Sequence, residues 1–330
     1  MLKYSAKRFV LAILTLFGIS ATVFIIFWAL PFKPAAIACG QHCTPEKIAA
    51  NAHELGLDVP IYVQYGRFIK GLAVGGDYID GTQHCGAPSL GYSTVENQCV
   101  TPLLASKFWV SFSLAIGAFI LWMLIGIPLG IIAARYKSRW PDRLANTFVL
   151  VGTSLPTFLL GLLIYIAAFL AHWIDPLSQG QSISLFSDPI GFFHNYLFAW
   201  IALAVSSAAI YTRLTRGSII ETSGEDFIRT AKSKGVSEWR ILVKHNLRTA
   251  LSPIVSQAGL DFGGLLGGAV ITETIFQLPG LGQAALQAAL QTFDLPILIG
   301  TTLIAAAFIL LFNFLVDIAY GLLDPRVRIS

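Results

Sequence analysis

Long apolar stretches, repeated along the chain, constrain its fold more than any other feature. They cover residues 9–30 and about 108–134, 144–172, 195–212, 254–272 and 297–322. Each is near or above the roughly 20 residues that a helix needs to cross a bilayer. Only 12% of the residues are charged, against about 25% in a soluble domain, so a soluble fold would lack polar residues to cover its surface. The sequence therefore predicts an all-α integral membrane protein with six transmembrane helices.

The basic residues are distributed unevenly among the segments that join these stretches. With both termini in the cytoplasm, all but five of the 22 Lys and Arg residues fall in cytoplasmic segments. The five exceptions are Lys33, Lys47, Arg67, Lys70 and Lys107. Cytoplasmic loops of membrane proteins carry an excess of Lys and Arg, so we expect this orientation. The net charge is +4, and the basic residues stand in short loops between the apolar stretches. We therefore expect membrane lipid as a partner and no nucleic acid.

Residues 1–30 are expected to form a cytoplasmic tail and the first transmembrane helix, and residues 31–107 an extracytoplasmic subdomain. All the cysteines lie in this second segment: Cys39, Cys43, Cys85 and Cys99. Four thiols allow three pairings, of which Cys39–Cys43 with Cys85–Cys99 is the simplest. Disulfides are favoured on an oxidising face, so we expect no metal. His42 and His84 stand beside cysteines and leave a metal site as the alternative.

The longest polar interval on the expected cytoplasmic side covers residues 221–253. Its pattern predicts two short helices around Gly235, because glycine suits the left-handed conformation that follows a helix end. Ser223 and Asp226 have the spacing of a capping box for the first helix, and Ser237 can cap the second. The interval is therefore predicted to be folded. The alternative is a solvated basic loop that only sets the orientation of the chain.

Asp261 and Asp317 are the carboxylates within the predicted spans. A charge in lipid is costly, so such residues face the bundle interior or water. Asp261 is therefore a candidate for lining a translocation path, with a structural hydrogen bond to a neighbouring helix as the alternative. Gly263 and Gly267 belong to a run of glycines at four-residue spacing, which lets helices approach closely. Packing is the default interpretation of these glycines, and a gating hinge on the path is the alternative.

Sequence motifs for several chemistries are missing. The chain has no G-x-x-x-x-G-K-[ST] phosphate-binding loop, no H-E-x-x-H and no G-x-S-x-G. These motifs would provide ATP hydrolysis, zinc-dependent hydrolysis or a serine nucleophile. We therefore expect no enzymatic activity, no catalytic residues and no cofactor on this chain. An intramembrane enzyme would need a nucleophile or a metal constellation within the spans, and the sequence presents neither.

Several short motifs, in the same order, resemble those of the permease subunits of oligopeptide/dipeptide (and nickel) ATP-binding-cassette importers. The chain looks most like the first of their two paired permeases, and the resemblance covers nearly its whole length. The matching segments are Leu55–Tyr65, Gly126–Gly130 with Ala133–Ala134, Ser154–Phe158, Phe227–Gly235, Glu273–Phe276, Pro279–Gly282 and Leu322–Arg328. The chain departs from the family at Phe32-Lys33-Pro34 and in its longer, cysteine-bearing outer loop.

The resemblance implies a type I importer permease fold, with residues 108–330 as the core permease domain and residues 221–253 as a coupling segment. It implies a prokaryotic plasma (inner) membrane as the location. The implied partners are a homologous second permease, two ATPase subunits that bind ATP and magnesium, and an extracytoplasmic peptide-binding protein. The implied ATPase-coupling residues, which lie in the motif or directly beside it, are Asp226, Arg229, Thr230, Ala231, Lys232, Lys234, Gly235, Val236, Glu238 and Trp239. The implied substrates are oligopeptides or dipeptides, with nickel as the alternative. An alternative from another functional class is a channel, which would need no ATPase partner.

Overall fold

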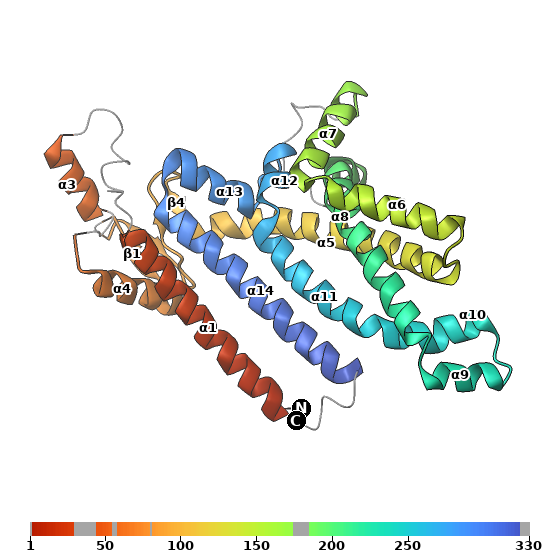
Figure 1. Ribbon diagram of the computed structural model, residues 1–330. Helices are drawn as coiled ribbons and strands as arrows, with labels where there is room; N and C mark the ends of the chain where they lie inside the picture. Colours follow the sequence, from red (N-terminus) through yellow and green to blue (C-terminus); the bar gives the residue numbers. More distant parts are fainter. Residues whose placement is uncertain (1, 30–43, 55–57, 80, 174–184, 324–330) are drawn as a thin grey trace.

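The computed structural model describes residues 2–29, 44–54, 58–79, 81–173 and 185–323. The chain is mostly helical, and its long helices form an elongated bundle (Figure 1). One end of the bundle carries short strands and a disulfide, and we call it the disulfide end (residues 76–99). The opposite end carries two short helices, and we call it the basic end (residues 226–240).

Four helices in the described part of the chain are long and apolar enough to cross a membrane. They are α1 (Leu2–Ala29), α5 (Val100–Arg135), α8 (Pro189–Thr222) and α14 (Leu295–Leu323). Each covers one predicted span, and α5 begins eight residues before residue 108, inside the stretch expected as the outer subdomain. α11 (Leu247–Gly268), of 22 residues, occupies most of the fifth predicted span but is not among these four. The number of six spans therefore stays a prediction.

The third predicted span, 144–172, is not one continuous helix but a bent pair of helices that together are long and apolar enough for one broken span. The segment forms α6 (Trp140–Ser154) and α7 (Thr157–Leu170), which are bent by 98° relative to each other. The bend falls at Pro156, which has no N–H to donate and forces Leu155 into an extended conformation (φ −90°, ψ 127°). Pro128 lies inside α5 without ending it. Figure 1 shows α7 turned away from the bundle.

The closest helix pair is α5 and α8, which meet along a row of glycines on α5: Gly117, Gly126 and Gly130. A Cβ at Gly117 would overlap the Trp200 indole. At Gly126 it would stand 2.9 Å from the Ala208 carbonyl oxygen, and at Gly130 2.8 Å from that of Thr212. These distances leave no room for a side chain, so glycine sets how closely the two helices approach.

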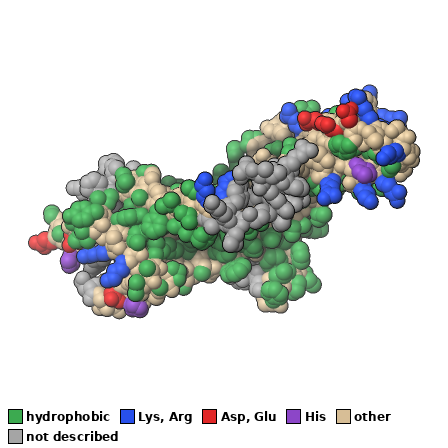
Figure 2. All heavy atoms as spheres, turned by 90° about the horizontal axis from the view of Figure 1, so that it is seen from below, with side chains coloured by type: hydrophobic (Ala, Val, Ile, Leu, Met, Phe, Trp, Pro, Cys, Tyr) green, Lys and Arg blue, Asp and Glu red, His purple; other side chains and the backbone are tan. Residues whose placement is uncertain are grey.

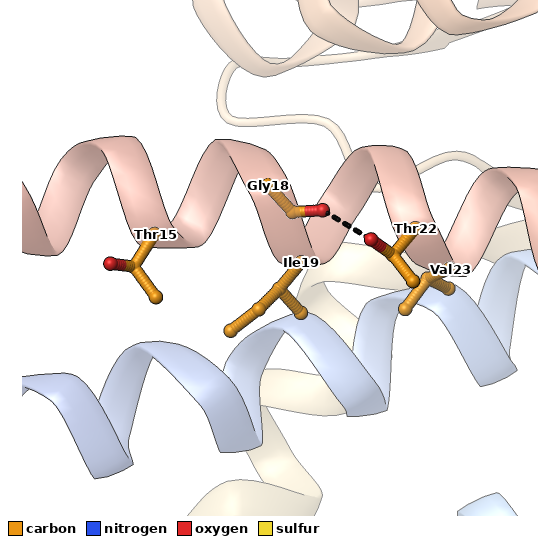
Figure 3. Close-up of a pocket in the computed structure, with 5 residues that line it drawn as sticks. All are labelled: Thr15, Gly18, Ile19, Thr22 and Val23. Atoms are coloured by element: carbon orange, nitrogen blue, oxygen red, sulfur yellow. Dashed lines mark hydrogen bonds between the residues drawn. The ribbon is translucent and has the colours of Figure 1, made fainter.

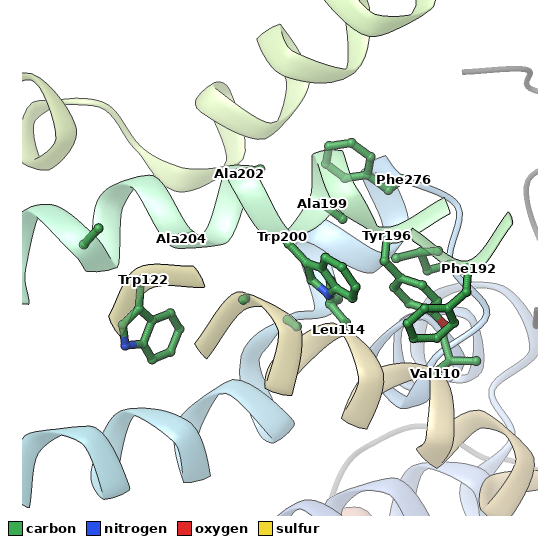
Figure 4. Close-up of a cluster of buried hydrophobic side chains, with 14 of the residues drawn as sticks. Val110, Leu114, Trp122, Phe192, Tyr196, Ala199, Trp200, Ala202, Ala204 and Phe276 are labelled. Carbon is green, nitrogen blue, oxygen red and sulfur yellow. The ribbon is translucent and has the colours of Figure 1, made fainter. Parts of the chain in front are cut away.

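Aromatic side chains fill the space beside this row of glycines (Figure 4). Tyr196 and Trp200 of α8 stack with ring centroids 5.7 Å apart, and Figure 4 shows them facing Val110 and Leu114 of α5. Trp200 Nε1 donates a hydrogen bond to the Ser113 carbonyl at 3.1 Å. The core of the bundle thus lies between α5 and α8.

The disulfide end consists of two short antiparallel hairpins and is preceded along the chain by α3 (Pro45–Glu54) and α4 (Ile61–Val74). The first hairpin pairs β1 (Gly76–Tyr78) with β2 (Gln83–Cys85), and the second pairs β3 (Tyr92–Ser93) with β4 (Gln98–Cys99). A disulfide joins Cys85 to Cys99 and so links one hairpin to the other. This bond is one half of the predicted pairing, whereas Cys39 and Cys43 lie outside the described residues.

The remaining elements connect the long helices. They are α9 (Asp226–Ser233), α10 (Glu238–Arg240), the π-helix η1 (Ile241–Asn246), α12 (Val270–Ile275), α13 (Leu281–Gln287) and the π-helix η2 (Ala288–Thr292). α1 packs antiparallel to α14 (Figure 1) and reaches α4 through a hydrogen bond of 2.8 Å between Ser20 and Tyr65. α13 packs against α5 and α14, whereas α12 packs against α7 and α8 (Figure 1).

Candidate functional site

The basic end lies within the predicted coupling segment (residues 221–253), and its shape depends on Gly235. This residue follows α9 with φ +72°, the left-handed region in which a Cβ is strained, as the sequence predicted. Its N–H donates to the Lys232 carbonyl at 3.0 Å, and the Val236 N–H donates to the Ala231 carbonyl at 3.2 Å. These bonds close the end of α9 and reverse the chain into α10.

Two further predictions for this segment were wrong. Ser223 does not cap α9, because α8 continues ten residues beyond the predicted span and ends at this serine, whose Oγ donates to the Ile219 carbonyl at 2.6 Å. The N-cap of α9 is Glu225, with no side-chain hydrogen bond. The second helix is not separate either. α10 runs directly into η1 and α11, and Ser237 stands at its start without a side-chain capping bond.

Asn246 ties the two arms of the segment together at their base. Its side chain is buried, and Nδ2 donates to the Ile219 carbonyl at 3.1 Å and to Ser223 Oγ at 2.6 Å. Apolar packing of Ile219 against Leu242 supports the same joint. The last turn of α8 is therefore fastened to the helix that continues into α11, and the α9–α10 segment projects from a fixed base.

Most of the predicted coupling residues are exposed on this projection. Asp226, Arg229, Thr230, Lys232, Lys234, Gly235, Glu238 and Trp239 are exposed, and Ala231 and Val236 are half-buried. Figure 2 shows Lys and Arg side chains gathered over this end and hydrophobic side chains over the middle of the molecule. The projection also exposes two aromatic side chains, Phe227 at 43% and Trp239 at 59%. Exposed aromatic residues among basic ones are typical of a surface that docks a protein partner.

One cation–π contact joins Trp239 to Arg135 at the end of α5, and Arg135 also lies over the ring of its neighbour Tyr136. The Arg135 guanidinium carbon lies 5.4 Å from the centroid of the Trp239 ring and 5.7 Å from that of Tyr136. Such contacts contribute about 0.5–1 kcal/mol at exposed sites. The projection therefore contacts α5, in addition to its connections to α8 and α11.

A buried ion pair fixes the neighbouring connection between α5 and α6, and the sequence analysis did not identify it. Arg216 donates to Asp142 through Nε (to Oδ1, 2.6 Å) and Nη2 (to Oδ2, 2.9 Å). Asp142 is 4% exposed and also accepts from the Ser138 N–H at 2.8 Å and from Asn146 at 3.0 Å. The two residues are 74 positions apart, so no local spacing marks the pair.

Two of the candidate path residues, Asp261 and Gly263, contact neighbouring helices. Asp261 is half-buried and accepts hydrogen bonds from Tyr211 of α8 and Gln257 of α11, both at 2.8 Å. Gly263 is buried, and a Cβ there would stand 3.4 Å from the Ile309 Cα of α14, which favours the packing interpretation. Gly267 lies in α11, and its surroundings fall outside the described features.

A carboxylate that the sequence analysis passed over is almost fully enclosed. Glu273 of α12 is 1% exposed. It lies one residue past the predicted fifth span and belongs to the Glu-Thr-Ile-Phe motif, but nothing in its spacing indicates a partner. Ser111 of α5 donates to it at 2.6 Å although the two residues are 162 positions apart.

In the part of the disulfide end that the structure describes, no cluster of His, Cys, Asp or Glu side chains could hold a metal ion. Cys85 and Cys99 are bonded to each other, so neither thiol is free to bind one. His84 Nδ1 lies 2.6 Å from Asp77 Oδ1, and His42 lies outside the described residues. Ser93 donates to the buried carboxylate of Asp294, which holds this end on the start of α14. Burial raises the pKa of the Asp294 carboxyl above its ordinary value, and the hydrogen bond from Ser93 opposes this rise.

A hollow of about 350 Å³ lies along α1 (Figure 3) and is lined by Thr15, Gly18, Ile19, Thr22 and Val23. The hydroxyls of Thr15 and Thr22 already donate to carbonyls of their own helix, each at 2.8 Å. The lining is mostly apolar and comes from one helix. It contains no charged group that could orient a peptide, so we do not assign it as a substrate site.

The sequence pattern of the family described as "Binding-protein-dependent transport system inner membrane component" matches residues 126–329, and the pattern for the N-terminal part of such components matches residues 1–115. The chain is 34% identical over 329 residues to the glutathione transport system permease protein GsiC of Escherichia coli (strain K12) and to that of Shigella boydii serotype 4 (strain Sb227). In both cases 99% of each chain is covered.

Two solved transporters share the fold at low sequence identity. An inward-facing structure of the MetNI methionine ABC transporter superposes with a TM-score of 0.54 at 19% identity, covering 68% of this chain and 99% of that one. An amino acid ABC transporter with histidines gives a TM-score of 0.51 at 20% identity, covering 67% and 94%. Both are ABC transporter chains, and the arrangement of helices described above is that of a type I ABC importer permease.

Proposed function

Because the chain belongs to the family of inner membrane components of binding-protein-dependent transport systems, we propose that it is the first of two paired permeases of an ATP-driven importer of small peptides. The basic end would face the cytoplasm and the disulfide end the other side, in accord with the distribution of Lys and Arg. ATP would be bound and hydrolysed by two partner ATPases, and an extracytoplasmic binding protein would deliver the substrate.

The observation that carries this proposal is the geometry of the α9–α10 projection. It is short and exposed, is reversed at a left-handed glycine, and is tied at its base by Asn246 to both α8 and α11. A rigid projection joined to two long helices suits a segment through which closure of a partner ATPase dimer moves the bundle. Ala231 and Gly235 match the alanine and glycine of the coupling motif and lie at the reversal itself.

The proposed cycle assigns a role to each region. Closure of the ATP-bound partners against residues 226–239 would move α8, α11 and α5 together, through Asn246 and through the contact of Arg135 with Trp239. The substrate would pass from the binding protein into a space between the two permeases, and hydrolysis would reset the complex. Asp261 and Gly267 are proposed to lie near that space, while Gly263 packs against α14.

We infer peptides as the substrate class because the relatives matched over 99% of the chain are named for transport of glutathione, a short peptide. Nickel is the alternative, and within the described residues no group of His, Cys, Asp or Glu side chains is arranged to hold a metal ion, while Cys85 and Cys99 form a disulfide. Peptide length and sequence preference would be set largely by the binding protein.

The test is ATP hydrolysis and uptake by the reconstituted importer, comprising both permeases, the ATPases and the binding protein. The binding protein is supplied loaded with glutathione, with a dipeptide, with nickel, or empty. Stimulation and uptake with glutathione or the dipeptide support the proposal, and stimulation by nickel alone would overturn the substrate class.

The Gly235→Pro variant tests the coupling role in the same assay. Proline cannot adopt φ +72°, so we expect assembly with uptake abolished. Gly217→Ala on α8 is the control, because a Cβ there meets nothing within 4 Å. Full uptake by Gly235→Pro would show that the projection does not transmit the motion.

A further inference from the structure

Glu273 is a buried carboxylate whose hydrogen bonds come from one hydroxyl and from backbone N–H groups. Ser111 Oγ donates to Oε1 at 2.6 Å, and the Gln283 N–H donates to Oε2 at 2.9 Å. The same Ser111 oxygen accepts the Leu281 N–H at 2.8 Å. One serine and one glutamate therefore connect three segments: α5, α12 and the start of α13.

The turn between α12 and α13 is built around this carboxylate. A Cβ at Gly280 would overlap the Glu273 carboxylate, and a Cβ at Gly282 would stand 2.7 Å from the Val270 Cα. The Leu278 N–H donates to the Glu273 backbone carbonyl at 2.8 Å, and the Leu278 side chain is fully buried. We call residues 270–287, comprising α12, the turn and α13, the α12–α13 hairpin. In this hairpin both glycines lie close against neighbouring atoms, and Gly280 packs on the hydrogen-bonded carboxylate of Glu273.

The helix that supplies Ser111 is the one that reaches the basic end. α5 is a single helix of 36 residues, about 54 Å long at 1.5 Å per residue. Its last residue, Arg135, lies over Trp239 of the projection. The stretch from Ser111 to Arg135 is therefore one continuous rod that contacts the α12–α13 hairpin near one end and the projection at the other.

We propose that Glu273 is a positioning residue for transport, which together with Ser111 fastens the α12–α13 hairpin to α5 so that the hairpin moves with α5 during the cycle. This inference rests on the proposed function, because it gives the projection a mechanical connection to the disulfide side of the bundle. The carboxylate touches no substrate. It acts by joining α5 to the α12–α13 hairpin, so that the hairpin moves when α5 moves.

The test compares Glu273→Gln and Ser111→Ala with Ser106→Ala in the reconstituted importer. Glutamine keeps the volume of glutamate but replaces one acceptor oxygen by a donor, and alanine removes both hydrogen bonds of the serine. Ser106 is also on α5, but it is exposed and bonds only to the carbonyl of Leu103 in its own helix. Uptake and ATP hydrolysis are expressed per assembled complex, so that a lower yield of folded protein does not change either rate.

We expect uptake per ATP hydrolysed to fall about tenfold in both variants, the size of effect given by losing a hydrogen bond to a buried charged group. Basal ATP hydrolysis should stay within about twofold, because the projection and its base are untouched. Hydrogen exchange of residues 276–287 should become faster in both variants and remain unchanged in Ser106→Ala.

Three results would overturn the inference. The first is normal uptake per ATP in both variants. The second is a loss of uptake and ATP hydrolysis in equal proportion, which would make the contact a support of the fold alone. The third is unchanged exchange of residues 276–287. If Glu273→Gln does not assemble, Ser111→Ala decides alone. Failure of the unsubstituted importer to take up any peptide would instead refute the proposed function, so the two failures are distinct.

Discussion

The Asp142–Arg216 pair gives the sharpest prediction for stability. Asp142 is 4% exposed, and its carboxylate receives two bonds from Arg216, one from the Ser138 N–H and one from Asn146. In Asp142→Ala these donors lose their acceptor while the guanidinium stays charged. Removing one partner of a buried pair costs about 3–5 kcal/mol. We expect the lower value, because the Arg216 side chain is 27% exposed and water can reach part of it.

The measurement is thermal unfolding of the purified protein in detergent, followed by tryptophan fluorescence. A loss of about 3 kcal/mol corresponds to a decrease of roughly 4–8 °C in melting temperature. Arg216→Lys should lie between the alanine variant and the unsubstituted protein, because lysine keeps the charge but cannot form the two parallel bonds. Arg213→Lys, on the same helix and exposed, should change little.

A double-mutant cycle separates the pair from its surroundings. Asp142→Ala combined with Arg216→Met removes both charges, so the loss should be smaller than the sum of the single losses by about 1–3 kcal/mol. Additive losses, or a change below about 1 kcal/mol in Asp142→Ala, would mean that the pair behaves as a solvated surface contact. The Asp142–Arg216 pair would then not fix the connection between α5 and α6.

Two further predictions follow from packing and from the disulfide. Gly117→Ala places a methyl group against the Trp200 indole and should destabilise the protein by about 1–3 kcal/mol, measured as a lower melting temperature. Gly217→Ala, in open space on α8, should be neutral or stabilising by up to about 1 kcal/mol; equal effects of the two changes would refute the close approach of α5 and α8. Replacing Cys85 and Cys99 by serine opens a loop with a sequence separation of 14 and should cost about 3 kcal/mol. The reducing agent dithiothreitol should lower the melting temperature of the unsubstituted protein but not that of the double variant, and the same decrease in both would mean that another bond is responsible.

The parts of the fold that depend on local pattern could be predicted from the sequence. The apolar stretches locate α1, α5, α8 and α14, because helix length in a bilayer is set by its thickness. Gly235 was identified because only glycine adopts its backbone conformation freely. The Ser223 capping box failed because α8 extends ten residues past its apolar part, and a serine-to-aspartate spacing cannot show where the preceding helix ends.

Features that depend on distant partners could not be predicted. Pro128 and Pro156 look alike in the sequence, yet one is accommodated within α5 and the other ends α6. Glu273 finds its hydroxyl partner 162 residues away, and Arg216 is 74 residues from Asp142. A single sequence contains no record of which helix faces which, so these pairs become visible only when the helices are placed.

The pairing of α5 with α8 has a consequence for how the protein is made. Two helices, α6 and α7, are synthesised between these neighbours, and α7 turns away at Pro156 and leaves the glycine face of α5 free. During synthesis the glycine face of α5 must contact lipid or an insertion factor until the ribosome has passed residue 222. The bundle therefore cannot close helix by helix as the chain emerges. Its central interface is completed only after α8 has been made, and until then apolar surface of α5 stays exposed to non-native contacts.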